Sequence, residues 1–187
     1  ELIELAKRVE SLGYGTLWHP ESLGWESISL GAFLLANTEH LVIGSSIANI
    51  YARDAVTSRQ ALKTLGAFSG ERYVLGLGVS HVPLVEGARG HVYGKPVPTM
   101  RRYLETIHKD WEGPAPAVVI AALGPRMLAL AGANARGAIP YNVTPEHTRN
   151  ARAIMGPDAW LAVEQKVCLS DDPTRARALA RQELERY

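Results

Sequence analysis

Apolar residues alternate along this chain between helix-like and strand-like runs. Residues 1–12 have helical spacing, with Leu2, Leu5 and Val9 recurring every three or four positions among charged residues. Short continuous apolar runs, such as 41–43 (LVI), are typical of buried strands. The same patterns predict helices at 27–37, 55–68 and 98–109, and strands at 16–18 and 73–78.

The second half of the chain repeats one formula three times. A β run is followed by a helix-capping position and then by proline, at Gly124-Pro125, Thr144-Pro145 and Asp172-Pro173. Proline is favoured at the first helical position, so each pair predicts the start of a helix. The expected strands lie at 118–122, at 138–139 and within 160–169, and the expected helices at 125–134, 145–154 and 173–187.

Strands that alternate with helices predict a parallel sheet with right-handed crossovers. Two α/β architectures fit this order: an open doubly wound sheet and a (β/α)8 TIM barrel. A complete barrel needs ~250 residues, whereas this chain has 187. We expect a single barrel domain over 1–187 that is incomplete, with the first strand and the last βα unit missing from this chain.

Composition and charge exclude several classes of function. The chain has 20 basic and 19 acidic residues, so its net charge of +1 does not suggest a nucleic-acid partner. No apolar run approaches the roughly 20 residues of a membrane span. Cys168 is the only cysteine, and we expect it in a strand of the core. No histidine spacing of the HxxxH or HExxH type suggests a metal site, and the default compartment is the reducing cytoplasm.

The stretch 73–81 (YVLGLGVSH) is the first candidate for a functional site. Glycines at the end of a buried strand let the backbone approach another molecule closely, although Gly-x-Gly equally marks a bulge or a tight turn. His81 can hold a proton near neutral pH. The dinucleotide-binding fingerprint fails, because its third glycine is replaced by His81 and Pro83 argues against an immediate helix. The long segment 82–97 is expected to be functional or mobile.

Five segments occur together in the order that one enzyme family shows. They are 17–21 (LWHPE), 43–54 (IGSSIANIYARD), 72–81 (RYVLGLGVSH), 123–128 (LGPRML) and 140–147 (PYNVTPEH). With them the chain resembles the bacterial luciferase-like flavin and deazaflavin oxidoreductases, and most closely their coenzyme F420-dependent branch. The resemblance implies a (β/α)8 barrel, a redox reaction and an isoalloxazine-like ring bound at the carboxyl ends of the strands.

The resemblance also implies which residues bind the cofactor. A cis peptide at Ser46–Ile47 would support the back face of the ring, and Asn49 would form a hydrogen bond with the polar edge of the ring. Residues 78–80 (Gly78, Val79 and Ser80) would lie beside the ring. The helix start at 123–126 (Leu123, Gly124, Pro125 and Arg126) suits the phosphate, because helix N-termini attract anions. The alternative is that these are ordinary loops and helix ends without a ligand.

Two residues are candidates for catalysis. His81 matches the position of a catalytic glutamate in an F420-dependent sugar-phosphate dehydrogenase of the same superfamily, so we predict that it gives or takes a proton. The alternative is a surface or cofactor-contacting histidine. Glu21 is predicted to orient the substrate or the ring, or else to be a helix-entry carboxylate. Arg53 is expected to pair with Asp54 or to reach an anion.

These residues predict an F420-dependent oxidoreductase that moves hydride between the deazaflavin and a small organic substrate. The alternative cofactor is FMN, in a luciferase-like monooxygenase. Ser22 occupies the place of the substrate-side histidine of true luciferases, which counts against oxygen chemistry. A third possibility is a non-catalytic flavin- or deazaflavin-binding protein on the same scaffold. The apolar helix at 27–37, expected to be well buried, predicts a homodimer face.

Overall fold

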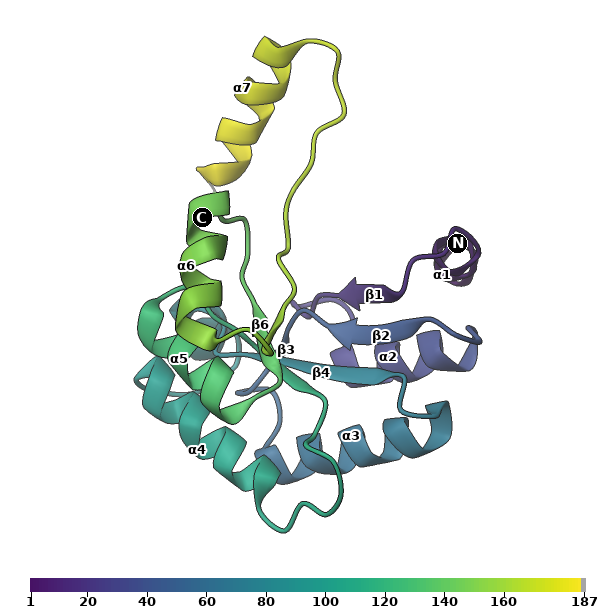
Figure 1. Ribbon diagram of the computed structural model, residues 1–187, viewed down its shortest axis with the longest axis vertical. Coiled ribbons are helices and arrows are strands. Elements are labelled where there is room, and N and C mark those ends of the chain that lie inside the picture. Colours follow the sequence, from purple (N-terminus) through teal and green to yellow (C-terminus); the bar gives the residue numbers. More distant parts are fainter. Residues whose placement is uncertain (186–187) are drawn as a thin grey trace.

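Residues 1–185 are described by a computed structural model, in which one parallel sheet is flanked by helices (Figure 1). The strands are β1 (Thr16–His19), β2 (Val42–Ser45), β3 (Ala48–Asn49), β4 (Tyr73–Gly78), β5 (Val118–Ala121), β6 (Gly137–Ile139) and β7 (Trp160–Leu161). The α-helices are α1 (Leu2–Ser11), α2 (Ser27–Ala36), α3 (Ala55–Ser69), α4 (Pro96–His108), α5 (Pro125–Asn134), α6 (Pro145–Met155) and α7 (Pro173–Leu184). The last two residues of the helix predicted at 173–187 lie outside the described part of the chain.

The sheet has the strand order β1-β2-β4-β5-β6-β7, with β3 paired to β4 and every pair parallel. Figure 1 shows α2, α3, α4 and α5 along one face of this sheet. The result is an α/β half-barrel, which confirms the predicted strand and helix alternation. Among the described residues, no helix combines the length and apolarity needed to cross a membrane.

Helix starts and stops follow the signals in the sequence. The Asp54 carboxylate accepts the N–H groups of Val56 and Thr57, each at 2.9 Å, and so caps α3. Gly70 ends α3 in the left-handed region, at φ 66°, a conformation that costs glycine little. Proline opens α5, α6 and α7 as predicted.

Strand β4 lies at the centre of the core, and all six of its residues are buried. Leu75 and Leu77 join the large cluster that includes side chains of the helices. Val74, directly before Leu75, belongs to a second cluster with Val119 and Ile139. Alternate residues of a strand point to opposite faces, so the sheet is packed on both faces.

Strands β2 and β3 form one interrupted strand beside β4. Ile43 pairs with Tyr73, and further along Ala48 pairs with Leu77. Five steps on one side therefore match four steps on β4, so the interrupted strand holds one extra residue, as in a β-bulge. The break between β2 and β3 is at 46–47.

The segment after β4 differs from its prediction. A π-helical segment, η1 (Pro83–Ala88), follows the strand almost directly, although Pro83 had argued against an immediate helix. The proline is tolerated because it occupies the first turn, where its missing N–H would lack a helical partner anyway. Helix α4 begins at Pro96, two residues before the predicted start at 98.

The strand predicted within 160–169 is present but short, and the expected place of Cys168 in a core strand is wrong. Regular pairing there is limited to β7 and to one isolated bridge between Tyr141 and Glu164. Cys168 is exposed and lies outside any strand, not in the core. The polar residues 164–166 interrupt the apolar run, and the chain then leaves the sheet toward α7, which stands apart from the other helices in Figure 1. Helix α7 has no buried residue.

Helix α2 is less buried than predicted. Only Ser27, Gly31, Leu34 and Leu35 are buried, and Phe33 is 45% exposed. The reason is geometric, because a helix that packs on a sheet hides one face only. One face of α2 is therefore exposed, and the homodimer contact predicted there stays a prediction.

Candidate functional site

The carboxyl ends of β3, β4 and β5 bring the predicted site segments to one edge of the sheet. Asn49 pairs with Gly78, and the N–H of Ile50 donates to the Gly78 carbonyl at 3.1 Å. Strand β4 pairs in turn with β5, through Leu77 and Ile120. Residue 49 and the segments 78–81 and 123–126 therefore lie at the carboxyl ends of three neighbouring strands.

The peptide bond between Ser46 and Ile47 is cis, as the resemblance implied. The Ser46 N–H donates to the His19 carbonyl at 2.7 Å, and the Ser46 hydroxyl donates to Glu164 Oε2 at 2.8 Å. The bulge is thus held by β1 and by the segment after β7. Glu164 was missed by the sequence analysis, because no local pattern marks a partner 118 residues away.

Two glycines of β4 make room for this bulge. A Cβ atom on Gly78 would lie 2.3 Å from Cδ1 of Ile47, and one on Gly76 would lie 1.8 Å from the Ser45 carbonyl oxygen. Ser45 Oγ also donates to the Gly76 carbonyl at 2.8 Å and accepts the Gly76 N–H at 2.9 Å. The Gly-x-Gly pattern therefore marks a bulge, and contact of Gly78 with a cofactor stays a prediction.

Glu21 is buried at the end of β1, with 3% of its side chain exposed. Its carboxylate accepts the Asn49 N–H at 2.7 Å and the Ser27 N–H at 3.4 Å. It also forms an ion pair with Arg53, whose Nη1 donates to Oε2 at 3.1 Å. These contacts favour the helix-entry alternative and do not support the catalytic one.

Arg53 pairs with Glu21 and with Glu26, at 2.6 Å in the second case. The expected pairing with Asp54 is wrong, because that carboxylate caps α3. Burial opposes the charge on Arg53, but the hydrogen bond to Glu21 and the charges of Glu21 and Glu26 together outweigh it and raise the pKa of the guanidinium. The three charged side chains tie the β3–α3 loop to the start of α2.

Two further polar groups surround this ion-pair network. Burial lowers the pKa of His19, which favours a neutral imidazole. Tyr103 donates its hydroxyl hydrogen to the Arg53 carbonyl at 3.0 Å and lies 2.6 Å from Ser58 Oγ. Burial raises the pKa of Tyr103 to about 12, so this hydroxyl stays protonated at neutral pH.

Asn49 is 1% exposed, and its Oδ1 atom accepts the Tyr51 N–H at 2.9 Å. Its Nδ2 group is buried and has no hydrogen-bond partner within residues 1–185. Buried donors are rarely left in this state. A polar group bound at this edge would satisfy it, which fits the predicted role of Asn49.

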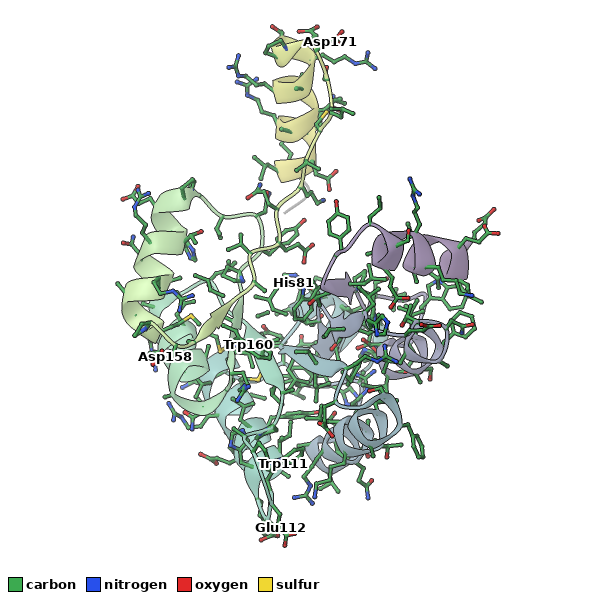
Figure 2. All side chains as sticks on the ribbon, turned by 45° about the vertical axis from the view of Figure 1, so that its right-hand side comes forward. His81, Trp111, Glu112, Asp158, Trp160 and Asp171 are labelled. Carbon is green, nitrogen blue, oxygen red and sulfur yellow. The ribbon has the colours of Figure 1, made fainter. Side chains whose placement is uncertain are left out.

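His81 is exposed directly beyond β4, after the partly buried Val79 and Ser80. Its carbonyl accepts the N–H groups of Leu84 and Val85, at 3.1 and 3.0 Å, which begins η1. Figure 2 shows His81 far from Trp111 and Glu112, the residues that precede β5. His81 therefore lies at the carboxyl edge, as predicted.

The start of α5 is the open part of the site. Residues 123–126 are all exposed, and no side chain caps the helix at Gly124. His147 Nε2 lies 2.7 Å from the Leu123 carbonyl oxygen, which fixes the approach to the helix. Unsatisfied N–H groups at a helix start attract anions, so the geometry fits the predicted phosphate position.

Two hollows accompany the edge. One, of about 570 Å³, lies beside Glu21 and Arg53 between α2, α3 and η1. The other, of about 430 Å³, lies between α5 and α6 and includes Leu123 and Pro125. Neither is lined by residues of 46–49 or 78–81.

Comparison with known proteins identifies the family. Residues 1–187 match the family model of the luciferase-like monooxygenases over the whole chain. The chain belongs to this family. The luciferase-like resemblance of its five sequence segments is thereby confirmed.

Among the relatives of this luciferase-like chain is a protein of Mycobacterium tuberculosis whose name assigns it provisionally to the coenzyme F420-dependent oxidoreductases. It is 31% identical over 113 residues, which make up 60% of this chain and 33% of the relative. The matched part thus spans about a third of the curated relative.

Solved structures show the same fold. The F420-dependent tetrahydromethanopterin reductase of Methanopyrus kandleri gives a TM-score of 0.73 at 19% identity, over 94% of this chain and 64% of the reductase. The oxygenating constituent of 3,6-diketocamphane monooxygenase from Pseudomonas putida, in complex with FMN, gives 0.73 at 15% identity, over 96% and 65%. The half-barrel is therefore similar to luciferase-like TIM barrels.

Proposed function

We propose that this chain provides the cofactor edge of an oxidoreductase that transfers hydride between coenzyme F420 and a small organic substrate. The observation that carries the proposal is that the cis-peptide bulge next to β3 and the exposed, uncapped start of α5 after β5 lie on the two sides of the same strand, β4. The F420-dependent name of the mycobacterial relative supports this choice of cofactor.

The residues at this edge fit a phosphorylated deazaflavin. The bulge at 46–47 would support the ring, Asn49 Nδ2 would donate to its polar edge, and the N–H groups of Gly124 and Arg126 would bind the phosphate. The bound cofactor would supply the hydride chemistry. His81 would hold or release a proton at its imidazole, since it lies on the same edge and is exposed to a substrate.

The rest of the assembly is proposed on coarser grounds. Strands β1 and β7 are the two edges of the sheet, so a further strand pairing with each would close a (β/α)8 barrel. The exposed face of α2 would form the contact of a homodimer. We assign the protein to the cytoplasm because the relative's redox cofactor and the single cysteine agree with a reducing compartment.

A titration of the full protein with F420 and with FMN tests the cofactor. We expect saturable binding of F420, turnover with small alcohols or carbonyl compounds, and a fall of 10²–10⁴-fold for His81→Ala, as for loss of an acid–base group. Asp171→Ala, in the segment before α7, is the control. Binding of F420 without any turnover would instead identify a non-catalytic binding protein.

The second candidate is an FMN-dependent monooxygenase. The FMN complex with the same fold favours it. Tight binding of FMN with reduced-flavin-driven oxygen uptake, and no binding of F420, would establish this function and exclude the first.

A further inference from the structure

Two tyrosines from different loops stack on each other near the carboxyl edge. Tyr51 follows β3, and Tyr93 lies between η1 and α4. Their ring centroids are 5.7 Å apart and their planes differ by 26°. Such offset pairs are favourable beyond the area they bury, so the pair connects the loop after β3 to the long segment after β4.

Each tyrosine hydroxyl bonds to the backbone of the segment after β4. Tyr93 Oη donates to the Ser80 carbonyl at 3.1 Å, and Tyr51 Oη accepts the Gly94 N–H at 2.8 Å. The Tyr93 N–H in turn donates to Glu86 Oε1 at 3.0 Å. Burial raises the pKa of Tyr93, so its hydroxyl remains a donor at neutral pH.

The Ser80 carbonyl belongs to the peptide plane that precedes His81. Ser80 has φ +57°, in the left-handed region, and lies beyond the last paired residue of β4, Gly78. The hydrogen bond from Tyr93 therefore helps to fix this plane. On the other side, the His81 carbonyl is fixed by the first turn of η1.

We propose that Tyr93, held by its stacking on Tyr51, is a positioning residue that sets the direction of the His81 imidazole at the carboxyl edge. The proposal deepens the proposed function and rests on the proton role given there to His81. Tyr51 acts one step further away, by holding the Tyr93 ring and Gly94 in place.

The first test does not depend on activity. In the full protein labelled with ¹⁵N-histidine, Tyr93→Phe keeps the stacked ring but removes the donor to Ser80. We expect the His81 ring signals, assigned with His81→Gln, to shift and to broaden. Tyr14→Phe, at an exposed tyrosine after α1, should leave them in place. Unchanged His81 signals in Tyr93→Phe would overturn the proposal.

The second test measures how the Tyr93 variants change turnover. Tyr93→Phe should lower kcat about fivefold with little change in KM, which corresponds to one neutral hydrogen bond. Tyr93→Leu, which also loses the stack, should lower kcat further. In a His81→Ala background, Tyr93→Phe should have no additional effect, because the two residues act as one unit.

The two tests separate the two proposals. A shift of the His81 signals in Tyr93→Phe, with full turnover in both Tyr93→Phe and His81→Ala, would support the positioning contact and overturn the proton role of His81. Additive losses in the double variant, without a shift of the His81 signals, would overturn the positioning role and leave the proton role supported.

Discussion

The two halves of the carboxyl edge are built on opposite principles. On the side of β1–β4, polar groups are buried and bonded to each other, and Asn49 is 1% exposed. On the side of β5, Leu123 is 52% exposed and the helix start has no side-chain cap. The first half is held mainly by its own hydrogen bonds and ion pairs and leaves the buried Asn49 Nδ2 donor for a ligand, whereas the second half presents an open helix start.

The difference separates stability from binding. A buried ion pair such as Glu21–Arg53 is costly to break, because one partner is left as an uncompensated charge. An exposed helix start adds little to stability but gains energy from an anion. Substitutions on the two sides should therefore give different phenotypes, and the following variants test that separation.

The largest effect is expected from Arg53→Met. It removes the partner of Glu21 and Glu26 while leaving both carboxylates in place. We expect a loss of about 3–5 kcal/mol in the free energy of unfolding, measured by urea denaturation. Adding Glu21→Gln should restore part of the loss by removing the stranded buried charge. A loss below about 1 kcal/mol would show that the network is not buried as described.

A smaller effect is expected from Gly78→Ala. The new methyl group would lie 2.3 Å from Cδ1 of Ile47, so the Ile47 side chain, the bulge or the strand must shift. Overpacking of this kind costs about 1–3 kcal/mol. Gly15→Ala is the matched control, because no atom lies within 4 Å of its added Cβ. If Gly78→Ala and Ile47→Ala were additive in the double variant, the bulge would not be the reason for the glycine.

The next effect is a dependence of stability on pH. Burial lowers the pKa of His19 below its ordinary value of 6.5, so the unfolded chain binds the proton more tightly than the folded protein. The contribution of His19 is therefore present above about pH 6.5 and is lost as pH falls toward its folded pKa, by at most about 1.4 kcal/mol per pH unit.

Urea denaturation between about pH 8 and pH 5 measures this slope. The variant His19→Leu should reduce it. Burial also lowers the pKa of His108, so the variant His108→Gln measures how much of the pH dependence comes from that residue. An unchanged slope in His19→Leu would show that the imidazole is solvated.

Local signals made much of the fold predictable. Asp54 caps α3 and Pro145 opens α6 where the sequence placed them, because capping depends on residues within one turn. The core position expected for Cys168 was wrong, since its neighbours Val167 and Leu169 look like strand residues but are 92% and 104% exposed. Apolar character alone does not show whether the rest of the molecule offers a surface for packing.

The site was predictable in position but not in contacts. The resemblance placed the cis peptide at 46–47 correctly. Glu21 bonds to Asn49, 28 residues away, and Ser46 bonds to Glu164, 118 residues away. The spacing of these residues in the sequence carries no information about such pairings. The stacking of Tyr51 on Tyr93 likewise appears only when the two loops fold together.

The smallest change in stability is expected on the open half, from Arg126→Met. The side chain is exposed, so the free energy of unfolding should stay within about 0.5 kcal/mol of the parent. Binding should respond instead, because the guanidinium adds charge beside the helix start that would hold the phosphate. We expect weaker F420 binding and a weaker dependence of that binding on salt.

Arg175→Met, on the detached helix α7, is the matched control for both measurements. Equal F420 affinity in the two variants would show that the Arg126 side chain does not bind the phosphate, so that only backbone groups would bind it there. A large loss of stability in Arg126→Met would contradict the proposed difference between the two halves of the edge. It would show that side chains on the β5 side contribute as much to the free energy of unfolding as Glu21 and Arg53 do.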